Sequence, residues 1–384
     1  MRVLATASAG TARLLAEECG DIGLRPRKVR AHGVELDLDW PEIARALIYL
    51  RTAQRVLVFL QQFPCGGGNS LYEGAAQVCW ADWLDPGQRI AVAASGRLPS
   101  KAVRGDSPIR THVFACQRVK DALCDQLRDA TGERPSVDLD DPDVRIVARF
   151  SGDACSLWLD PAGAALHRRG YRVESGPAPL RETLAAAIVR ASGWHGEQPL
   201  RDLLCGSGTV LIEAASAALG LAPGRDRTFA AERWRHRGHE LAGQIATERR
   251  AAVDAAHAAI AKPKLDVRGL DIDPRVLRLA EANVQRAGLG RHIQLRAGDA
   301  RHTSAPEPGS VLISNLPYGE RLGGDEVTVL YAELGRHWAG FTGCEAHLLV
   351  GHDDFAPTFG LRWTDRMALT NGSLPVTLFL YELG

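Results

Sequence analysis

The sequence predicts an α/β protein in which a mostly parallel, doubly wound sheet follows two smaller α+β units. Two observations indicate this fold class. From residue 199 onward, short apolar runs alternate with segments of helical periodicity, as in βαβ units. Before about residue 165, strands and helices follow one another in a mixed order, and the glycine-rich segment 64–70 interrupts them.

The first unit, residues 1–62, is predicted to alternate between strands and helices, beginning and ending with a strand. Val34 to Leu38 alternates apolar and polar residues, as a half-buried strand does. Trp40 and Pro41 then open a helix, since proline is favoured at the first helical position. The expected strands are 3–5, 34–38 and 55–60, and the expected helices are 11–19 and 42–50.

The second unit, residues 63–165, is predicted to combine two helices with three strands. The connection Ser151-Gly152-Asp153 has the length and composition of a hairpin loop, so the strands on either side of it should pair. The expected helices are 70–83 and 112–131, and the expected strands are 89–94, 144–150 and 154–159.

The third unit, residues 166–384, is expected to begin with a linker and a first helix at 166–198. Strands and helices then alternate, and Pro274 stands at the first position of one of these helices. This alternation is typical of a doubly wound sheet. The expected strands are 200–204, 265–270, 292–295, 310–313, 346–350 and 376–381, and the expected helices are 209–219 and 274–287.

The composition argues against several classes of protein. The chain has 384 residues, 45% of them hydrophobic, which suits two or three globular domains. Apolar runs of about 18 residues are absent and the N-terminus lacks the apolar stretch of a signal peptide, so we expect a cytoplasmic protein without a membrane span. The eight cysteines include no CxxC pair, so we expect reduced thiols and no metal site.

Basic residues are clustered, although 46 Lys and Arg are balanced by 46 Asp and Glu. A nucleic-acid-binding protein is usually more basic than this, so a solvated surface is an equal alternative for each cluster taken alone. We nevertheless predict that two clusters contact the phosphates of a nucleic acid. Their members are Arg97, Lys101, Arg104, Arg110, Arg168, Arg169 and Arg172.

A glycine turn follows the first strand of the third unit, where doubly wound sheets bind their ligands. Glycines in the segment 205–209 allow a ligand to approach the backbone, and the next helix favours a carboxylate at its N-terminus. Asp271 and Asp299 follow the next two strands, where they can accept from ribose hydroxyls and an adenine amino group. A plain turn beside solvated aspartates is the alternative. The predicted cofactor site comprises Thr183, Asp202, Cys205, Gly206, Gly208, Thr209, Asp271, Ile272, Asp299, Ala300 and Asn315.

The segment Asn315-Leu316-Pro317-Tyr318 follows the fourth strand and should face the same crevice. The Asn315 side-chain oxygen and the Leu316 carbonyl are two acceptors for the N–H groups of a planar amino group. Such a group is a poor nucleophile because its lone pair is delocalised, and two acceptors favour the pyramidal nitrogen that attacks a sulfonium methyl group. Pro317 fixes the backbone, and Tyr318 can stack on the ring. The pattern predicts methyl transfer from S-adenosylmethionine, with these four residues as the catalytic set.

The four-residue segment does not select the substrate, since N6 of adenine, N4 of cytosine, N2 of guanine and the amide of glutamine all fit it. A resemblance narrows the choice. The chain resembles the THUMP-domain RNA methyltransferases, most closely the bacterial 23S rRNA guanine-N2 methyltransferases. The segments that carry the resemblance are 166–172, 180–188, 204–209, 213–215, 314–322 and 371–374, including Tyr318-Gly319-Glu320-Arg321-Leu322.

The resemblance implies a ferredoxin-like domain at 1–62, a THUMP RNA-binding domain at 63–165 and a Rossmann-like class I methyltransferase domain at 166–384. It implies S-adenosylmethionine as cofactor and 2-methylguanosine in 23S rRNA, or in an assembling large subunit, as product. We also expect a monomer. Many relatives have proline where this chain has Leu316, a change that keeps the carbonyl acceptor.

Other functions stay open on the sequence alone. A tRNA guanine is the runner-up substrate, and an adenine N6 is a weaker one. A ribosome-assembly factor that binds RNA without activity is disfavoured, because an inactive site has no need for the full set of predicted residues. A protein glutamine is disfavoured because about 165 residues of RNA-binding type precede the catalytic unit.

Overall fold

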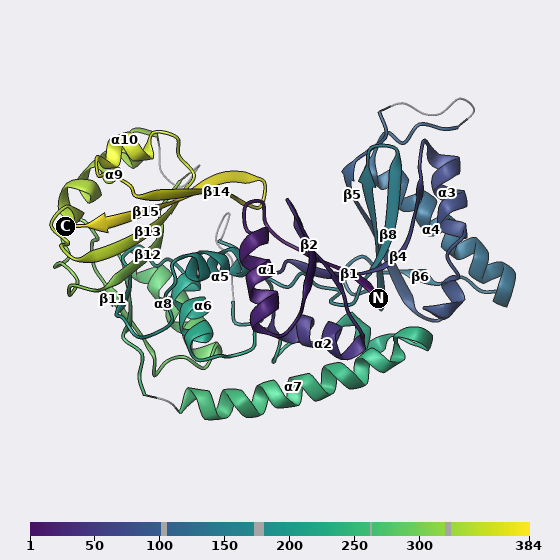
Figure 1. The fold of residues 1–384 in the computed structure, drawn as a ribbon, viewed down its shortest axis with the longest axis horizontal. Coiled ribbons are helices and arrows are strands. Elements are labelled where there is room, and N and C mark those ends of the chain that lie inside the picture. Colours follow the sequence, from purple (N-terminus) through teal and green to yellow (C-terminus); the bar gives the residue numbers. More distant parts are fainter. Residues whose placement is uncertain (101–105, 173–179, 262, 319–323) are drawn as a thin grey trace.

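The computed structural model describes residues 1–100, 106–172, 180–261, 263–318 and 324–384. Two sheets dominate these residues, one of eight strands in the N-terminal half and one of seven in the C-terminal half (Figure 1). The arrangement confirms the predicted α/β fold class with two α+β units before a mostly parallel sheet.

The N-terminal sheet has the strand order β2-β3-β1-β4-β8-β7-β5-β6. Its first four strands belong to the first unit, and the antiparallel pairing of β4 with β8 joins that unit to the second in one continuous sheet. The elements of the first unit are β1 (Arg2–Thr6), α1 (Ala12–Asp21), β2 (Pro26–Arg30), β3 (Gly33–Asp37), α2 (Trp40–Tyr49) and β4 (Arg55–Pro64).

In the second unit, helix α4 packs against strands β5 and β7, and helix α3 packs against α4 and β4. Its elements are α3 (Gly68–Ala76), η1 (Trp80–Asp82), β5 (Arg89–Arg97), α4 (His112–Thr131), β6 (Ser136–Val137), β7 (Val144–Ser151) and β8 (Ala154–Asp160). The predicted hairpin is present, since β7 and β8 pair in antiparallel register. The predicted helix at 70–83 is shorter in the structure and is followed by the 3-10 turn η1.

The C-terminal sheet has the order β11-β10-β9-β12-β13-β15-β14. Strand β9 pairs in parallel with both β10 and β12, so the chain reverses its direction of travel across the sheet at β9. The elements are α5 (Glu182–Ala191), β9 (Leu200–Asp202), α6 (Thr209–Ala218), β10 (Val267–Asp271), α8 (Pro274–Arg286), β11 (Ile293–Ala297), β12 (Val311–Asn315), α9 (Gly324–Trp338), β13 (Cys344–Val350), α10 (Phe355–Phe359), β14 (Asp365–Asn371) and β15 (Leu374–Leu383).

Both faces of this sheet are buried, which explains the apolar runs of its strands. Along β12, Val311 and Ile313 join a core with residues of α5, α6 and α8, whereas Leu312 joins a core with residues of α9 and α10. In the part of the chain that the structure describes, no helix is long and apolar enough to cross a membrane.

A segment between α6 and β10 reaches from the C-terminal sheet to both N-terminal units. It contains the 3-10 turns η2 (Ala230–Arg233) and η3 (His236–Gly238) and the helix α7 (His239–Ile260). Helix α7 runs beneath α2 in Figure 1, and the Arg45 Nε atom lies 3.5 Å from Glu248 Oε1 between the two helices. Helix α7 therefore packs against α2 of the first unit.

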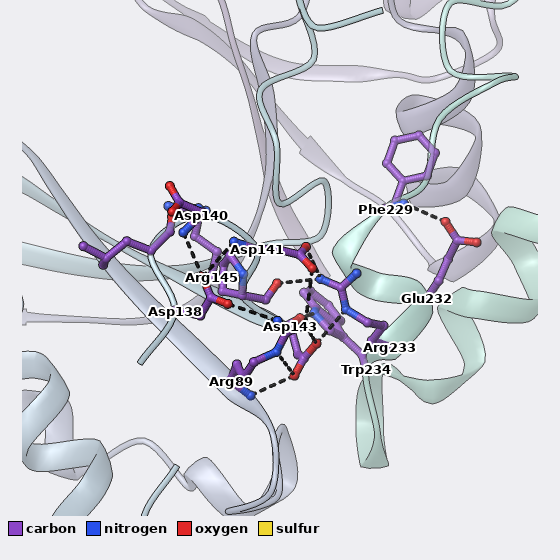
Figure 2. Close-up of polar contacts among 12 residues, drawn as sticks. Arg89, Asp138, Asp140, Asp141, Asp143, Arg145, Phe229, Glu232, Arg233 and Trp234 are labelled. Carbon is purple, nitrogen blue, oxygen red and sulfur yellow. Dashed lines mark hydrogen bonds and ion pairs between the residues drawn. The ribbon is translucent and has the colours of Figure 1, made fainter. Parts of the chain in front are cut away.

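The η2 end of this segment docks on an acidic turn of the second unit (Figure 2). Arg233 Nη2 donates to Asp141 Oδ1 (2.8 Å) and to the Pro142 carbonyl (2.9 Å). The Trp234 indole nitrogen donates to the Asp143 carbonyl (3.1 Å), and the Trp234 side chain is almost fully buried. Arg89 holds the same turn from β5 by ion pairs to Asp138, Asp141 and Asp143. A buried aromatic ring and a cluster of charged hydrogen bonds thus fix the second unit to the C-terminal half of the chain.

We predict that Trp234→Ala lowers the free energy of unfolding by about 3–5 kcal/mol, because it removes a buried aromatic ring and leaves a cavity. Arg235→Ala is the matched control one residue away, since the Arg235 side chain is 65% exposed and its pair with Asp85 is a surface ion pair worth about 1 kcal/mol or less. Urea denaturation followed by circular dichroism measures both. Equal losses for the two variants would show that the ring does not secure this junction.

Candidate active site

The glycine turn between β9 and α6 has backbone angles that glycine adopts most readily. Gly206 has φ +53° and Gly208 has φ +79°, both in the left-handed region. The Gly208 nitrogen donates to the Cys205 carbonyl (2.8 Å), and α6 begins at Thr209. A Cβ added at Gly206 would meet no atom within 4 Å, so the turn is open on this side. The residues present thus fit a ligand that approaches the backbone.

Asn283 of α8 supports the glycine turn, a role that the local sequence pattern did not predict. Its side chain is 1% exposed, and its amide nitrogen donates to the Ser207 carbonyl (3.0 Å). The available signal was its place on the buried face of α8, between Ala280 and Val284. A polar residue on such a face usually has a hydrogen-bond partner.

Asp271, the last residue of β10, braces the turn from the side. Its Oδ2 accepts from the Gly206 backbone nitrogen (2.9 Å) and its Oδ1 accepts from the Asp273 backbone nitrogen (3.0 Å). A carboxylate has about four acceptor sites, so Asp271 can accept further bonds from ligand hydroxyls. Ile272 beside it is 64% exposed although it is apolar. Together the two residues offer a polar and an apolar contact next to the glycines.

Asp299, just after β11, is already engaged by Arg301, which is not among the predicted site residues. Arg301 Nη2 donates to Asp299 Oδ2 (2.6 Å), and Arg301 Nε donates to Oδ1 (2.9 Å). These hydrogen bonds lower the pKa of Asp299, and they occupy much of its acceptor capacity. The neighbouring Ala300 is buried, and its carbonyl accepts from the Trp338 indole (3.1 Å). Contacts of Asp299 and Ala300 with an adenine ring remain predictions.

Asp202 lies buried at the end of β9, bonded to the strand that carries the Asn315 segment. Ser314 Oγ donates to Asp202 Oδ1 (2.7 Å) and accepts from the Leu203 backbone nitrogen (3.2 Å). Burial raises the pKa of Asp202 to about 7. The Asp202 side chain is almost fully buried and links β9 to β12 through this hydrogen bond. Its contact with a cofactor remains a prediction.

Asn315 ends β12 at the same edge of the sheet as Asp271 and the glycine turn. Its Oδ1 is buried and, among the residues that the structure describes, has no hydrogen-bond donor. Such an atom is costly to leave unpaired, which points to a donor supplied by a ligand. Leu316 is anchored to β13 by the bond from its nitrogen to the Leu349 carbonyl (3.0 Å), and the Pro317 carbonyl accepts from the Tyr331 hydroxyl (2.5 Å). The segment is thus held rigidly.

Tyr318 is packed more tightly than a stacking platform requires. Its side chain is 9% exposed, and a Cβ added at Gly351 would lie 2.7 Å from its ring. Its hydroxyl oxygen accepts from the Asn371 amide nitrogen (3.2 Å). Base stacking by Tyr318 therefore remains a prediction that needs one face of the ring to open. Gly319 to Leu322, with Glu320 and Arg321, lie outside the described residues.

Thr183, Cys205 and Thr209 are all buried near the turn. Thr183 Oγ1 has no hydrogen-bond partner in the described ranges, which suits the predicted ligand contact. Burial raises the pKa of the Cys205 thiol, so it is neutral at ordinary pH. The Thr209 Oγ1 accepts from Arg172 Nη2 (2.8 Å). Within the described part of the chain, no group of three or more His, Cys, Asp or Glu side chains could hold a metal ion.

The predicted phosphate-binding arginines divide into exposed and buried residues. Arg97, Arg110 and Arg168 are exposed, which suits contact with a nucleic acid. Lys101 and Arg104 lie outside the described residues.

Arg169 requires a correction, because its side chain is only 5% exposed. Its guanidinium donates to the Leu166 carbonyl (2.7 Å) and to the Arg51 carbonyl, and it lies 3.6 Å from Glu213 of α6. It therefore joins the first unit to the catalytic half and is not accessible to a phosphate. A run of basic residues in the sequence does not reveal which of its members fold inward.

Arg172 is also mostly used within the protein. Its Nη2 donates to the Leu180 carbonyl (2.9 Å) and to Thr209, and its Nε lies 3.3 Å from Glu182 Oε1. Its side chain is 11% exposed. Arg172 thus ties the start of α5 to the start of α6, and phosphate contact by Arg172 has less support than contact by Arg168.

Comparisons with known families agree with this architecture. The family model described as the RMKL-like methyltransferase domain matches residues 169–378, the THUMP domain model matches 69–160, and the RlmL ferredoxin-like domain model matches 2–57. A curated protein of Photobacterium profundum, named ribosomal RNA large subunit methyltransferase K/L, is 37% identical over 385 residues. The alignment covers 98% of this chain and 52% of that protein, so the chain spans about half the length of this relative.

Two solved structures are similar over nearly the whole chain. SMU.472, solved in complex with SAH, has a TM-score of 0.86 and 29% identity, with 100% of this chain and 98% of that chain covered. A protein from Listeria monocytogenes str. 4b F2365, described as a predicted N6-adenine-specific DNA methylase, has a TM-score of 0.83 and 29% identity, with 99% and 95% covered. Both likenesses include the N-terminal sheet as well as the C-terminal one.

We predict that Asp271→Ala lowers the affinity for S-adenosylmethionine by about 1.5–3 kcal/mol, the usual contribution of hydrogen bonds to a charged group. Asp273→Asn is the matched control two residues away. The Asp273 side chain caps α8 by accepting from the Arg275 nitrogen, and asparagine preserves that cap. Isothermal titration calorimetry should give a weakened Asp271→Ala and an unchanged Asp273→Asn. Unchanged affinity in Asp271→Ala would remove Asp271 from the cofactor site.

Proposed function

We propose that this chain, which belongs to the RMKL-like methyltransferase family and carries THUMP and RlmL ferredoxin-like domains, methylates the exocyclic N2 of a guanine in large-subunit ribosomal RNA. S-adenosylmethionine is the proposed methyl donor, and 2-methylguanosine in 23S rRNA is the proposed product. The observation that carries the proposal is the buried, unpartnered Oδ1 of Asn315, among the described residues, beside the open glycine turn.

Support for the cofactor comes from the site and from a similar structure. SAH, which is bound in the SMU.472 structure, is what S-adenosylmethionine becomes when its methyl group has left. In this chain, Asp271 would accept from the ribose hydroxyls, Ile272 would cover the adenine ring, and the N-terminus of α6 would face the carboxylate. The bound cofactor supplies an electrophilic methyl group on sulfur.

The chain's own part in the chemistry is to bind and orient the amino group. Asn315 Oδ1 and the Leu316 carbonyl would accept its two N–H bonds and turn the nitrogen lone pair toward the methyl group. The Leu316–Leu349 and Pro317–Tyr331 bonds hold these acceptors in place before the substrate arrives. The nitrogen becomes acidic only after it is methylated, so a strong base is not required at the start.

The choice of N2 of guanine and of 23S rRNA rests on the sequence resemblance and on the name of the curated relative. Because the chain spans about half of that relative, the relative's whole activity is not transferred with it. A tRNA guanine is the second candidate, as it is on the sequence alone. Methylation of an adenine N6 is a weaker candidate, which the name of the Listeria protein, a predicted N6-adenine-specific DNA methylase, also suggests.

Loss of the protein should remove one 2-methylguanosine from 23S rRNA. Mass spectrometry of nucleosides and of ribonuclease fragments, from strains with and without this protein, identifies both the modified base and the RNA. Loss of an N6-methyladenosine, or of a tRNA modification with rRNA unchanged, would overturn the proposed substrate while leaving the methyltransferase site intact.

We predict that Asn315→Ala loses about 2.7–4 kcal/mol of transition-state stabilisation, by analogy with the removal of one preorganised polar group. Its affinity for S-adenosylmethionine should change little. Tyr318→Phe is the control, because it keeps the ring and removes the hydroxyl that accepts from Asn371. The rate of single-turnover methyl transfer to RNA distinguishes the two variants. A near-normal rate in Asn315→Ala would contradict the role of this side chain.

A further inference from the structure

A basic cavity lies beside the catalytic segment. It has a volume of about 650 Å³ and is bounded by the segment 167–172, the first turn of α5 and the turn between β14 and β15. We call it the basic pocket. Its lining includes His167, Arg168, Arg172, Arg181, Asn371 and Gly372. Its size is within the range of pockets that hold small ligands.

The charge of the basic pocket is poorly balanced. Among the described lining residues, Glu182 is the one carboxylate, and it faces Arg172 at 3.3 Å. Arg168 and Arg181 have no hydrogen bond or ion pair from their guanidinium groups to any described residue. Burial, and then repulsion from four neighbouring arginines, lowers the pKa of His167 to about 4. A site with this excess of positive charge favours an anion.

The basic pocket is built around the Arg181 side chain. Arg181 stands at the N-cap of α5, with no side-chain hydrogen bond capping the helix. Gly372 in the opposite turn has φ +68°, and a Cβ there would lie 3.5 Å from Arg181 Nη2. The guanidinium therefore lies against the β14–β15 turn and across the cavity from the segment that carries Arg168.

Two walls of the basic pocket also form part of the candidate active site. Asn371, the last residue of β14, donates to the hydroxyl of Tyr318. Arg172 donates to Thr209, the first residue after the glycine turn. A ligand in the pocket would thus lie next to whatever base is presented to Asn315.

We propose that the basic pocket binds the sugar–phosphate backbone of the nucleotide whose base is methylated, with Arg168 and Arg181 as its phosphate ligands. The inference rests on the proposed function. A base inside folded RNA must be turned out of its stack to reach Asn315, and its backbone must then be held. Guanidinium groups suit this task because they bind phosphate oxygens in pairs. The carboxylate of the cofactor is the competing anion, and the experiment separates the two.

The test measures RNA affinity at several salt concentrations for Arg168→Ala, Arg181→Ala and the double variant. Arg13→Ala is the matched control, because Arg13 is 90% exposed on α1 and far in sequence from the pocket. Each pocket substitution should weaken RNA binding about tenfold, as expected for bonds to a charged group, and should reduce the salt slope by about 0.7–0.9 per lost phosphate. The affinity for S-adenosylmethionine should not change.

A fall in cofactor affinity with an unchanged salt slope of RNA binding would assign the pocket to the cofactor carboxylate and overturn the proposal. No change in either affinity would also overturn it.

A second probe does not depend on how the variants fold. Guanosine 5′-monophosphate should raise the pKa of His167 in an NMR titration, whereas guanosine, which lacks the phosphate, should not. Equal shifts of the His167 pKa with the two compounds would also overturn the proposal. Failure of the proposed function is read separately, from the modified nucleoside that the wild-type protein forms.

Discussion

The hydrogen bond between the Ser314 hydroxyl and the Asp202 carboxylate holds the candidate active site together. It joins the ends of β9 and β12 across 112 positions of sequence. Strand β9 has three residues, so its ladder alone gives the glycine turn little support. The Leu203 nitrogen donates to the same hydroxyl, which makes the junction a small buried network. Through it, the open glycines and the buried acceptor of Asn315 meet at one edge of the sheet.

This edge is also tied to the N-terminal units, which share one continuous sheet through β4 and β8. Arg51 donates to the carbonyls of Ser216, in the last turn of α6, and of Leu221, just beyond the end of that helix. Arg169 and the docked Trp234 add two further junctions. If the N-terminal sheet binds a structured RNA, these junctions set the distance between the RNA-binding surface and Asn315. The position of the target base would then be determined by the shape of the RNA.

The fold could be predicted from the sequence wherever a buried element carries a regular pattern of apolar residues. The apolar runs that became β10, β12 and β13 were identifiable because both faces of their sheet are covered. Strand β2 was missed because all five of its residues are exposed, so that no alternation exists. The glycine turn and the Asn315 segment were predictable because their chemistry is local. The inward fold of Arg169 and the Asn283 support depend on distant partners, which a local pattern cannot show.

The central claim is that Asn315 and Leu316 receive the exocyclic amino group of a guanine. The most direct measurement compares methyl transfer to two otherwise identical RNA fragments, one with guanosine and one with inosine at the modified position. Inosine keeps the ring and lacks the N2 amino group. The account predicts stoichiometric transfer to the guanosine fragment and none to the inosine fragment, with both fragments binding the protein. Methylation of the inosine fragment at a comparable rate would contradict it.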